Sequence, residues 1–561
     1  MDVIIRPILT EILQSHLDAS VQLLGQHEYN AYLAYLSLNP DEQGHFQRLL
    51  LRKYPYQRVD KLELSQECFN RLLSKQLLQP FLLPVEQSMT ILTRSELIEQ
   101  CKKKDIPSNG KKSDLIQRLM PHWQDDFAPK MVWISHRNLF QKAVQWYTSN
   151  PRGSIEQLIL QELGYRQYLS KGLTNSLPIF KSRKERRLFE IARRLSPYRL
   201  KNPPRIQWVC SLINDIDTLV DQSQNPFFNP LTRLYRSVQQ WAGHLAKIDL
   251  SSALKFLHLI PHQSQWPELV RKMALECQRQ GIPQDGLRLI ENIIKGHDIE
   301  SQLPLIQSYN QMAHKIGKPR MTLPIIQAPK DREITLNQIS HHKNRPRFMV
   351  IDKELSVEKA VCELLESEGH KAIFAEGVIW HALMIILFWE AFSAPLTEQL
   401  PSPVLRAPLD FQTPQFAPRR LKWIDPIMRQ IENGGAIALF NSNQHHLEVT
   451  ARGLESNRIT AQNLLTILEN FPAEALAKMM HIIIFDCQQV CRGMPDLIVF
   501  PRHDTPFSCA FPNRFRSPFL LAELKTRSDK LSPAQRIWFH RLTLANIPAE
   551  LWQINHQSRS P

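Results

Sequence analysis

Glycine is scarce in this sequence, with 17 residues among 561, whereas proline is plentiful at 39. Few glycines together with many leucines argue against a β-barrel or propeller and favour helices joined by turns that contain proline. Disorder over most of the length is excluded, because 43% of the residues are hydrophobic and 22% are charged, as in ordinary globular proteins. At roughly 100–200 residues per domain, about three to five domains are expected.

A long uncharged apolar run is also missing. The most apolar stretch, Val378–Phe392, is shorter than the roughly 20 residues of a membrane span and contains His381 and Glu390. The first residues, MDVIIRPILTEILQSH, carry an acid at position 2 and no small-residue cleavage site, unlike a secretory signal. We therefore expect no membrane partner. The expected location is the cytoplasm, in association with the nucleoid, if the source is bacterial, and the nucleus if it is eukaryotic.

Cysteine is infrequent, with eight residues and no CxxC pair. Cys487 and Cys491 are four residues apart and could share a helix face, but no second Cys or His pair stands at ligand spacing beside them. A disulfide framework and a zinc knuckle are therefore excluded, and reduced thiols in a reducing compartment are expected.

Acidic residues are outnumbered by basic ones, which gives a formal net charge of +15 and favours a polyanionic partner. In residues 1–84, Leu and Tyr recur at three- and four-residue steps, and Asn39 followed by Pro40 is typical of a helix start. This range is predicted to be an N-terminal helical DNA-binding domain. Its basic, aromatic segment Leu36–Tyr56 either touches DNA or is the solvated face of a helix.

Residues 85–128 contain two short helices around a basic turn. Thr93 and Glu96 form a capping box for the first helix, and Ser113 is predicted to cap the second. The capped helix, the turn Pro107–Gly110 and the following KKSDLIQRL resemble the SAP motif, a DNA-binding helix–loop–helix unit. The resemblance implies that five lysines lie near phosphates, whereas the alternative is a solvated basic hairpin. These lysines are Lys102, Lys103, Lys104, Lys111 and Lys112.

Residues 129–346 are predicted to be a helical linker and tetratricopeptide-like repeats, with prolines between the helices. The basic helix Lys181–Leu195 carries Arg183, Lys184 and Arg187, which would face DNA or, alternatively, a membrane surface. Two helical hairpins follow, in residues 234–260 and 267–296, with the loose period of tetratricopeptide-like repeats. Such repeats build a curved scaffold, and no functional residue is assigned to them.

The pattern changes after Arg347. Two amphipathic helices flank a short extended piece, and Glu376 begins the second helix. Asp496 directly precedes the buried strand Leu497–Phe500, and Glu523 and Lys525 lie in and after a second apolar strand that begins at Phe519. The alternation of a strand places Glu523 and Lys525 on one face and Leu524 on the other. Ser532 and Pro533 then open a helix, and AELWQI forms a last strand.

These residues form a PD…ExK pattern with 26 residues between Asp496 and Glu523. Carboxylate oxygens suit Mg²⁺ or Mn²⁺, and such a cation assists the hydrolysis of a phosphodiester. Lys525 could orient the attacking water and stabilise developing charge. The pattern alone is loose, and a surface ion pair at the end of a strand is the alternative.

Three segments in the same order, EGVIWHALMIILFWEAF, CRGMPDLIVF and LLAELKTRSDKLSPAQRIWFHRL, resemble the VRR-NUC nuclease domain. With the SAP-like unit and the repeats, nearly the whole chain resembles the Fanconi-associated nuclease family. The resemblance implies a hydrolase of DNA phosphodiester bonds: an endonuclease at 5′ flaps and a 5′-to-3′ exonuclease. It also implies dependence on one or two Mn²⁺ or Mg²⁺ ions and a role in DNA repair of interstrand crosslinks.

The family's site residues are carried over by motif. Glu376 matches the family's helix acid, Asp496 the acid after proline, and Glu523 with Lys525 the ExK pair. Leu524 occupies the position whose backbone carbonyl binds the metal, and Gln535 matches a polar position that supports the site. The resemblance therefore implies a metal site made by Glu376, Asp496, Glu523 and the Leu524 carbonyl.

The expected fold is a mainly α multidomain protein with a C-terminal α/β restriction-endonuclease-like core and a mixed sheet, in which residues 347–561 form the nuclease domain. We expect a monomer that cuts branched double-stranded DNA. A junction resolvase of the same core, usually a dimer, and a non-catalytic DNA-binding scaffold are the alternatives. The compact length and the lack of an N-terminal Cys/His cluster fit a bacterial member without ubiquitin-dependent recruitment, and protein partners remain unknown.

Overall fold

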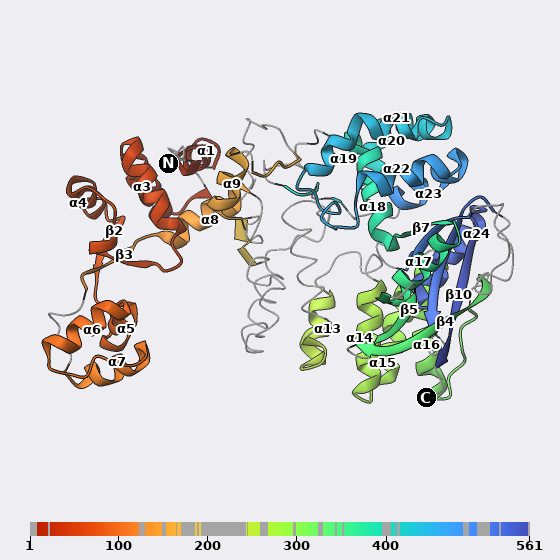
Figure 1. The fold of residues 1–561 in the computed structure, drawn as a ribbon, viewed down its shortest axis with the longest axis horizontal. Coiled ribbons are helices and arrows are strands. Elements are labelled where there is room, and N and C mark those ends of the chain that lie inside the picture. The colour runs from red at the N-terminus through yellow and green to blue at the C-terminus, as the bar shows by residue number, and fades with distance from the viewer. Residues whose placement is uncertain are drawn as a thin grey trace. The chain divides into compact units, whose positions relative to one another are not determined.

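The computed structural model describes residues 8–20, 23–122, 129–148, 153–163, 165–169, 186–187, 190–191, 243, 245–258, 267–294, 299–323, 329–342, 345–350, 353–394, 396, 405–408, 410–411, 416–485, 493–501, 517–526 and 529–558. The chain forms two compact units, Met1–Tyr165 with Thr174–Ser182 and Arg166–Leu173 with Arg183–Pro561 (Figure 1). Helices predominate in both, and the second contains a mixed sheet, so the predicted fold class is confirmed.

The first unit consists of helices around a small antiparallel sheet. Its helices are α1 (Ile8–Ser20), α2 (Gln26–Leu36), α3 (Pro40–Leu51), α4 (Gln66–Ser74), α5 (Val85–Ile91), α6 (Arg94–Lys103), α7 (Lys112–Leu119), α8 (Arg137–Tyr147) and α9 (Ile155–Glu162). Helix α3 begins as predicted, because the Asn39 side chain accepts a hydrogen bond from the backbone N–H of Glu42.

The expectation that residues 1–84 are helical throughout is wrong. Strands β1 (Tyr56–Arg58) and β2 (Leu78–Phe81) flank β3 (Met131–Ile134) in the order β1-β3-β2. Each strand has only three or four residues, too few to show a period of two, and the pairing joins segments that are far apart in the chain. Such pairing is decided by tertiary contacts rather than by local pattern.

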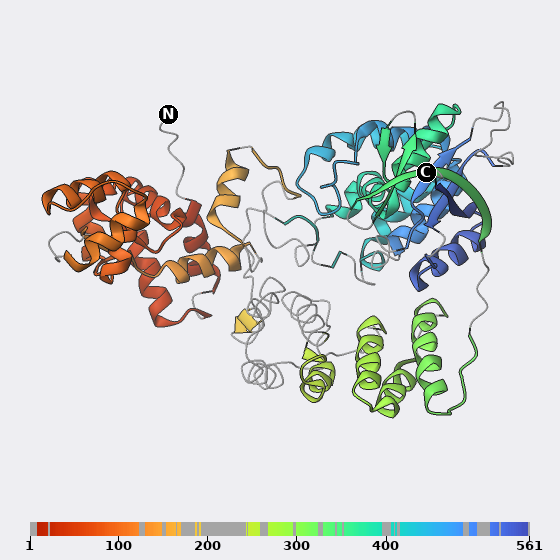
Figure 2. The same ribbon diagram turned by 60° about the horizontal axis from the view of Figure 1, so that its bottom comes forward.

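Within the predicted repeats, the second unit contains α13 (Leu250–His258), α14 (Pro267–Arg279) and α15 (Pro283–Ile294). Helix α16 (Ile299–Lys315) follows them and lies outside the two predicted hairpins. Helices α14 and α15 form the second predicted hairpin and share a core with α16 (Figure 2). Gly286 allows the close approach, since a Cβ there would lie 2.7 Å from the backbone oxygen of Ala274. Most of the first helix of the first predicted hairpin lies outside the described residues, whereas its second helix is α13.

The sheet of the second unit has seven strands in the order β6-β5-β4-β10-β9-β8-β7. They are β4 (Lys330–His342), β5 (Arg345–Val350), β6 (Lys353–Leu355), β7 (Lys371–Phe374), β8 (Leu497–Phe500), β9 (Leu520–Thr526) and β10 (Ala549–Ser558). Strand β10 pairs in parallel with β9 and β4, and the other neighbours are antiparallel. Because β4 lies within residues 129–346, the all-helical expectation for that range is wrong.

Helices cover both faces of this sheet. Along β8, Leu497 and Val499 pack in the core that includes α17 (Val357–Ser367), while Ile498 and Phe500 pack in the core on the other face. That second core contains α24 (Pro533–Leu544) and the helices that precede β8. The strands near the candidate site are therefore held on both sides, which is why they are nearly continuous apolar runs.

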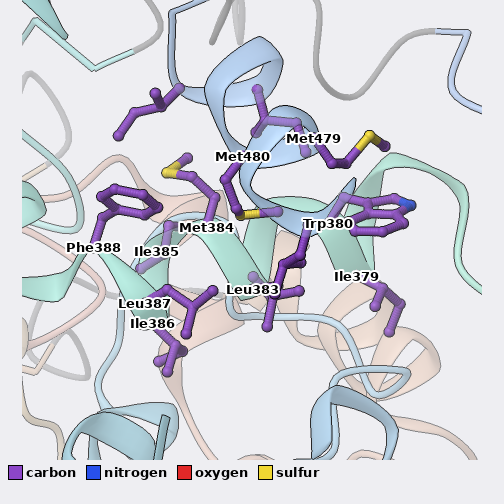
Figure 3. Packing of buried hydrophobic residues seen from close by; sticks show 14 of the residues in the cluster. Ile379, Trp380, Leu383, Met384, Ile385, Ile386, Leu387, Phe388, Met479 and Met480 are labelled. Carbon is purple, nitrogen blue, oxygen red and sulfur yellow. The ribbon is translucent and has the colours of Figure 1, made fainter. Parts of the chain in front are cut away.

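Between β7 and β8 the chain forms a helical layer. Its helices are α18 (Glu376–Leu387), α19 (Trp389–Phe392), α20 (Leu421–Glu432), α21 (Ala436–Asn443), α22 (Ala461–Asn470) and α23 (Ala473–Phe485). Figure 3 shows side chains of α18, among them Trp380 and Leu383, beside Met479 and Met480 of α23. The apolar run that includes α18 thus forms a buried core helix.

None of the helices in the described part of the chain is both long enough and apolar enough for a membrane span. The four cysteines whose placement is described are all free thiols: Cys68, Cys101, Cys277 and Cys362. Cys487 and Cys491 lie outside the described residues.

Candidate active site

The starts of α18 and β8 are joined through their backbones. The carbonyl oxygen of Asp496 accepts hydrogen bonds from the N–H groups of Ala375 and Glu376, at 2.9 and 3.1 Å. Glu376 has a φ of 41°, a left-handed conformation that is costly for a residue with a Cβ. The bond to Asp496 helps to hold this conformation and keeps the predicted helix acid next to the acid that follows proline.

Glu523 lies on β9 with only 1% of its side chain exposed. Its Oε1 accepts from Nζ of Lys525 at 2.7 Å, so the two predicted partners on one face of the strand form an ion pair. The same oxygen accepts from the side-chain amide of Gln535, whose Oε1 accepts in turn from the N–H of Ser532. The N-terminal cap of α24 therefore also orients Glu523, and the predicted start of α24 at Ser532 and Pro533 is confirmed.

Leu524 links the two strands of the pattern. Its backbone N–H donates to Oδ2 of Asp496 at 2.9 Å, and its side chain is buried in the core on the α17 face. The predicted alternation along β9 is therefore confirmed. The metal role of its carbonyl remains a prediction.

Burial and mutual repulsion perturb the two inner carboxylates. Burial raises the pKa of Asp496 to about 6, and the charges of Glu358 and Glu376 add to the rise, against the Leu524 N–H and Lys525, which lower it. Burial and the neighbouring Asp496 raise the pKa of Glu523 to about 8, although Lys525 lowers it. Burial and mutual repulsion therefore make both carboxylates harder to ionise than free side chains. Adjacent buried carboxylates of this kind are typical of functional sites.

A divalent cation fits these residues. Oε2 of Glu523 is buried and has no hydrogen-bond partner among the described residues. The double positive charge of such a cation would stabilise the ionised forms of Asp496 and Glu523, which burial and mutual repulsion disfavour. The candidate ligands are Glu376, Asp496, Glu523 and the Leu524 carbonyl.

A preformed cluster is not found. Within the described ranges, no three His, Cys, Asp or Glu side chains are grouped closely enough to hold a metal ion. The expected convergence of three carboxylates on one cation therefore stays a prediction. The charge of Glu376 contributes to the raised pKa values of Asp496 and Glu523, while its carboxylate accepts from Arg458, with Nη1 3.0 Å from Oε2. The Glu376 side chain is 47% exposed, so this side of the group faces solvent.

Sequence reasoning missed three residues of the site. Glu358 lies in the first turn of α17, where an acid is ordinary, and Arg458 lies in a turn outside any motif. Gly493 has a φ of +83°, and a Cβ there would lie 2.6 Å from the backbone of Ala534 and Gln535. The contact of Gly493 with α24 joins segments that are far apart in the chain and has no local sequence signal.

The SAP-like unit has the predicted helices, α6 and α7, and the predicted capping box of Thr93 and Glu96. The prediction that Ser113 caps the second helix is wrong. Lys111 is the N-cap residue, and its N–H donates to the Asp114 carboxylate at 2.9 Å, because the acid sits three residues after it.

The predicted DNA-binding residues differ in their surroundings. Lys102 and Lys111 are exposed, whereas Lys103 pairs with Glu99 at 2.7 Å and Nζ of Lys112 donates to the backbone of Thr90. Lys104 and Arg187 are partly buried, and Arg183 and Lys184 lie outside the described residues. Phosphate binding by this set stays a prediction.

Two domain families match the chain. The VRR-NUC domain matches residues 431–554, and the SAP domain matches residues 92–124. The predicted domains of the nuclease and SAP types are thereby confirmed. Glu376 precedes the matched VRR-NUC range, and its role as a ligand stays a prediction.

Curated relatives include Fanconi-associated nuclease 1 homologues. The one from Pseudomonas aeruginosa is 23% identical over 92% of this chain and 89% of its own length. The one from Schizosaccharomyces pombe is 26% identical over 36% of this chain, and the match spans only 27% of that relative. For the Oryza sativa homologue the match spans 19% of the relative.

The fold is that of a solved relative. A crystal structure of paFAN1 bound to 5′-flap DNA with a gap superposes with a TM-score of 0.77, at 19% identity over 98% of both chains. A second paFAN1 complex with flap DNA gives a TM-score of 0.75. The restriction-endonuclease-like C-terminal core is thus present.

Proposed function

The chain carries VRR-NUC and SAP domains and resembles the Fanconi-associated nuclease family over nearly its whole length, and from this premise we propose that it is a metal-dependent DNA nuclease selective for branched duplexes. The proposed reactions are endonucleolytic cleavage at 5′ flaps and 5′-to-3′ exonucleolytic cleavage. The proposed role is DNA repair, including repair of interstrand crosslinks. The proposed working form is a monomer.

One observation carries this proposal. Asp496, directly before β8, lies next to β9, which carries Glu523 and Lys525, and the N–H of Glu376 donates to the backbone of Asp496. Mn²⁺ or Mg²⁺ at the carboxylates, as one ion or two, would polarise the phosphate and lower the pKa of a bound water.

The chain's own groups have separate tasks in this proposal. Asp496 and Glu523 must be ionised to act as ligands, so a bound cation must offset the burial and repulsion that raise their pKa values. The Lys525 ammonium, now paired with Glu523, supplies positive charge where the phosphate gains negative charge. Gln535 fixes the Glu523 carboxylate through its amide. The Leu524 N–H fixes Asp496.

DNA binding is assigned to the basic residues of both units. We propose that the exposed Lys102 and Lys111 of the SAP domain contact phosphates, and such contacts orient a protein without reading sequence. The net charge of +15 supports the same partner. The solved relative was crystallised with 5′-flap DNA, and that substrate class is proposed for this chain.

The test uses end-labelled 5′-flap, Holliday-junction and plain duplexes with Mn²⁺, Mg²⁺ or a chelator. We expect a single incision near the flap junction that requires the divalent cation and is lost in Asp496→Asn. Preferred, paired cutting of the Holliday junction would support a resolvase instead. Binding of flap DNA without any cleavage under all metal conditions would support the non-catalytic scaffold.

A further inference from the structure

Arg458 is held beside the acidic site by contacts on three sides. Its guanidinium carbon lies 4.1 Å from the ring centroid of Phe374, the last residue of β7, and Nη1 donates to Glu376 at 3.0 Å. Its carbonyl oxygen accepts from the side-chain amide of Asn463 in α22, at 3.1 Å. A planar guanidinium that stacks on a ring and pairs with a carboxylate is oriented in advance for bidentate contact with an anion such as phosphate.

The Arg458–Glu376 pair is also open to solvent. The side chains are 39% and 47% exposed, in contrast with the Lys525–Glu523 pair, at 15% and 1%. Exposed ion pairs are weak, so a doubly charged cation would displace this one more readily than the buried one. The exposed pair therefore joins a candidate metal ligand to a cation that a DNA strand can reach.

We propose that Arg458 is an exchangeable counter-ion: it occupies the Glu376 carboxylate while no metal is bound, and on metal binding it is released to bind a DNA phosphate beside the cut. This inference rests on the proposed nuclease function. No covalent step is involved, since one ion pair is exchanged for another. Without DNA, Arg458 competes with the metal for the Glu376 carboxylate. A DNA phosphate gives the guanidinium a second anion to bind, so DNA binding and metal binding strengthen each other.

The test measures Mn²⁺ binding by titration calorimetry on the full chain without DNA, and then with an uncleavable flap duplex. In Arg458→Gln, removal of the competing charge should tighten Mn²⁺ binding without DNA by about fivefold. DNA should raise the Mn²⁺ affinity of the unchanged protein, and this increase should be smaller in Arg458→Gln. The incision kcat should fall by roughly tenfold or more, because the released guanidinium is missing.

Two further variants control the test. Arg429→Gln removes an exposed arginine from the last turn of α20, away from the machinery, and should leave Mn²⁺ binding and cleavage unchanged. Arg458→Lys keeps the charge without the planar fork, so Mn²⁺ affinity should stay near that of the unchanged protein while cleavage falls. If Arg458→Gln fails to fold, the Lys variant still decides, because tighter Mn²⁺ binding there would overturn the exchange.

The inference and the proposed function fail separately. Equal or weaker Mn²⁺ binding by a folded Arg458→Gln overturns the counter-ion role, whether or not the unchanged protein cleaves DNA. An unchanged protein that binds Mn²⁺ but cuts no DNA overturns the nuclease proposal, while the Mn²⁺ titrations still test the exchange.

Discussion

The N–H of Glu376 donates to the carbonyl oxygen of Asp496 at 3.1 Å, so the two acids are fixed through their backbones although they are far apart in the chain. Their distance of approach therefore does not depend on side-chain rotamers. The Glu376 side chain is 47% exposed and pairs with Arg458. A fixed backbone next to an exposed carboxylate suits a site that must bind a cation and then a substrate.

Gly493→Ala should destabilise the packing of α24 on the active-site turn. The new Cβ would meet the backbone of Ala534 and Gln535 at 2.6 Å and would also require a strained φ of +83°. We expect the free energy of unfolding to fall by roughly 2–4 kcal/mol and hydrogen–deuterium exchange in α24 to become faster. Gly281→Ala is the matched control, because Gly281 has a φ of +81° with nothing within 4 Å, so it should cost only about 1 kcal/mol. An equal loss of unfolding free energy in Gly493→Ala and Gly281→Ala would show that the close contact of Gly493 with α24 does not affect stability.

Gln535→Ala should slow DNA cleavage by roughly tenfold or more, because it removes the amide that orients Glu523. Ser532→Ala separates this effect from helix capping. It removes the hydroxyl that accepts from the N–H of Gln535, at a cost of about 1 kcal/mol, and should leave the cleavage rate within about twofold. Steady-state cleavage rates and melting curves of both variants check this. Equal cleavage rates for Gln535→Ala and Ser532→Ala would mean that Gln535 only caps α24 and does not orient Glu523 for catalysis.

Glu96 makes the stability of the first unit depend on pH. The Arg58 side chain, together with hydrogen bonds from Thr93, lowers the pKa of Glu96 to about 2. A lowered folded-state pKa stabilises the fold above the unfolded value of about 4.5, and this contribution disappears as the pH falls towards 2. The melting temperature of Glu96→Gln should therefore lie below that of the unchanged protein at pH 6, and the difference should narrow at pH 3. If the difference in melting temperature is the same at pH 6 and pH 3, the lowered pKa of Glu96 is not the source of the stabilisation.

Lys102→Gln combined with Lys111→Gln should weaken flap binding and reduce its salt dependence. Each phosphate contact that is lost should lower the slope of log K against log salt by about 0.9. Fluorescence anisotropy over a range of salt concentrations measures this. Lys478→Gln, which removes an exposed lysine paired with Glu474 in α23, is the control and should keep the slope. An unchanged slope in the double variant would remove these lysines from the DNA interface.

The parts of the site that the sequence predicts are those with a local pattern. Strand β8 reads as a continuous apolar run, β9 carries Glu523 and Lys525 at alternating positions, and Ser532 with Pro533 is a strong start signal for α24. The order of these motifs was enough to propose one site, because adjacent strands end at the same edge.

The remaining parts depend on tertiary contacts. Strand β4 alternates Ile334 and Leu336 with polar residues, yet it becomes a strand within the sheet because it pairs in parallel with β10 from the other end of the chain. Arg458 lies in a turn without a motif and reaches Glu376 only after α22 and β7 have packed. Neither the partner of a strand nor the neighbour of a turn is encoded in a short window of sequence.

The most direct measurement of the central claim is single-turnover cleavage of a labelled 5′-flap duplex in Mn²⁺ by Glu523→Gln, with protein in excess over DNA. The substitution keeps the shape of the side chain and removes the charge that burial and Asp496 already make costly. We predict a rate at least roughly 10³-fold below that of the unchanged protein, with flap binding retained. Cleavage by this variant within about tenfold of the unchanged rate would contradict the account.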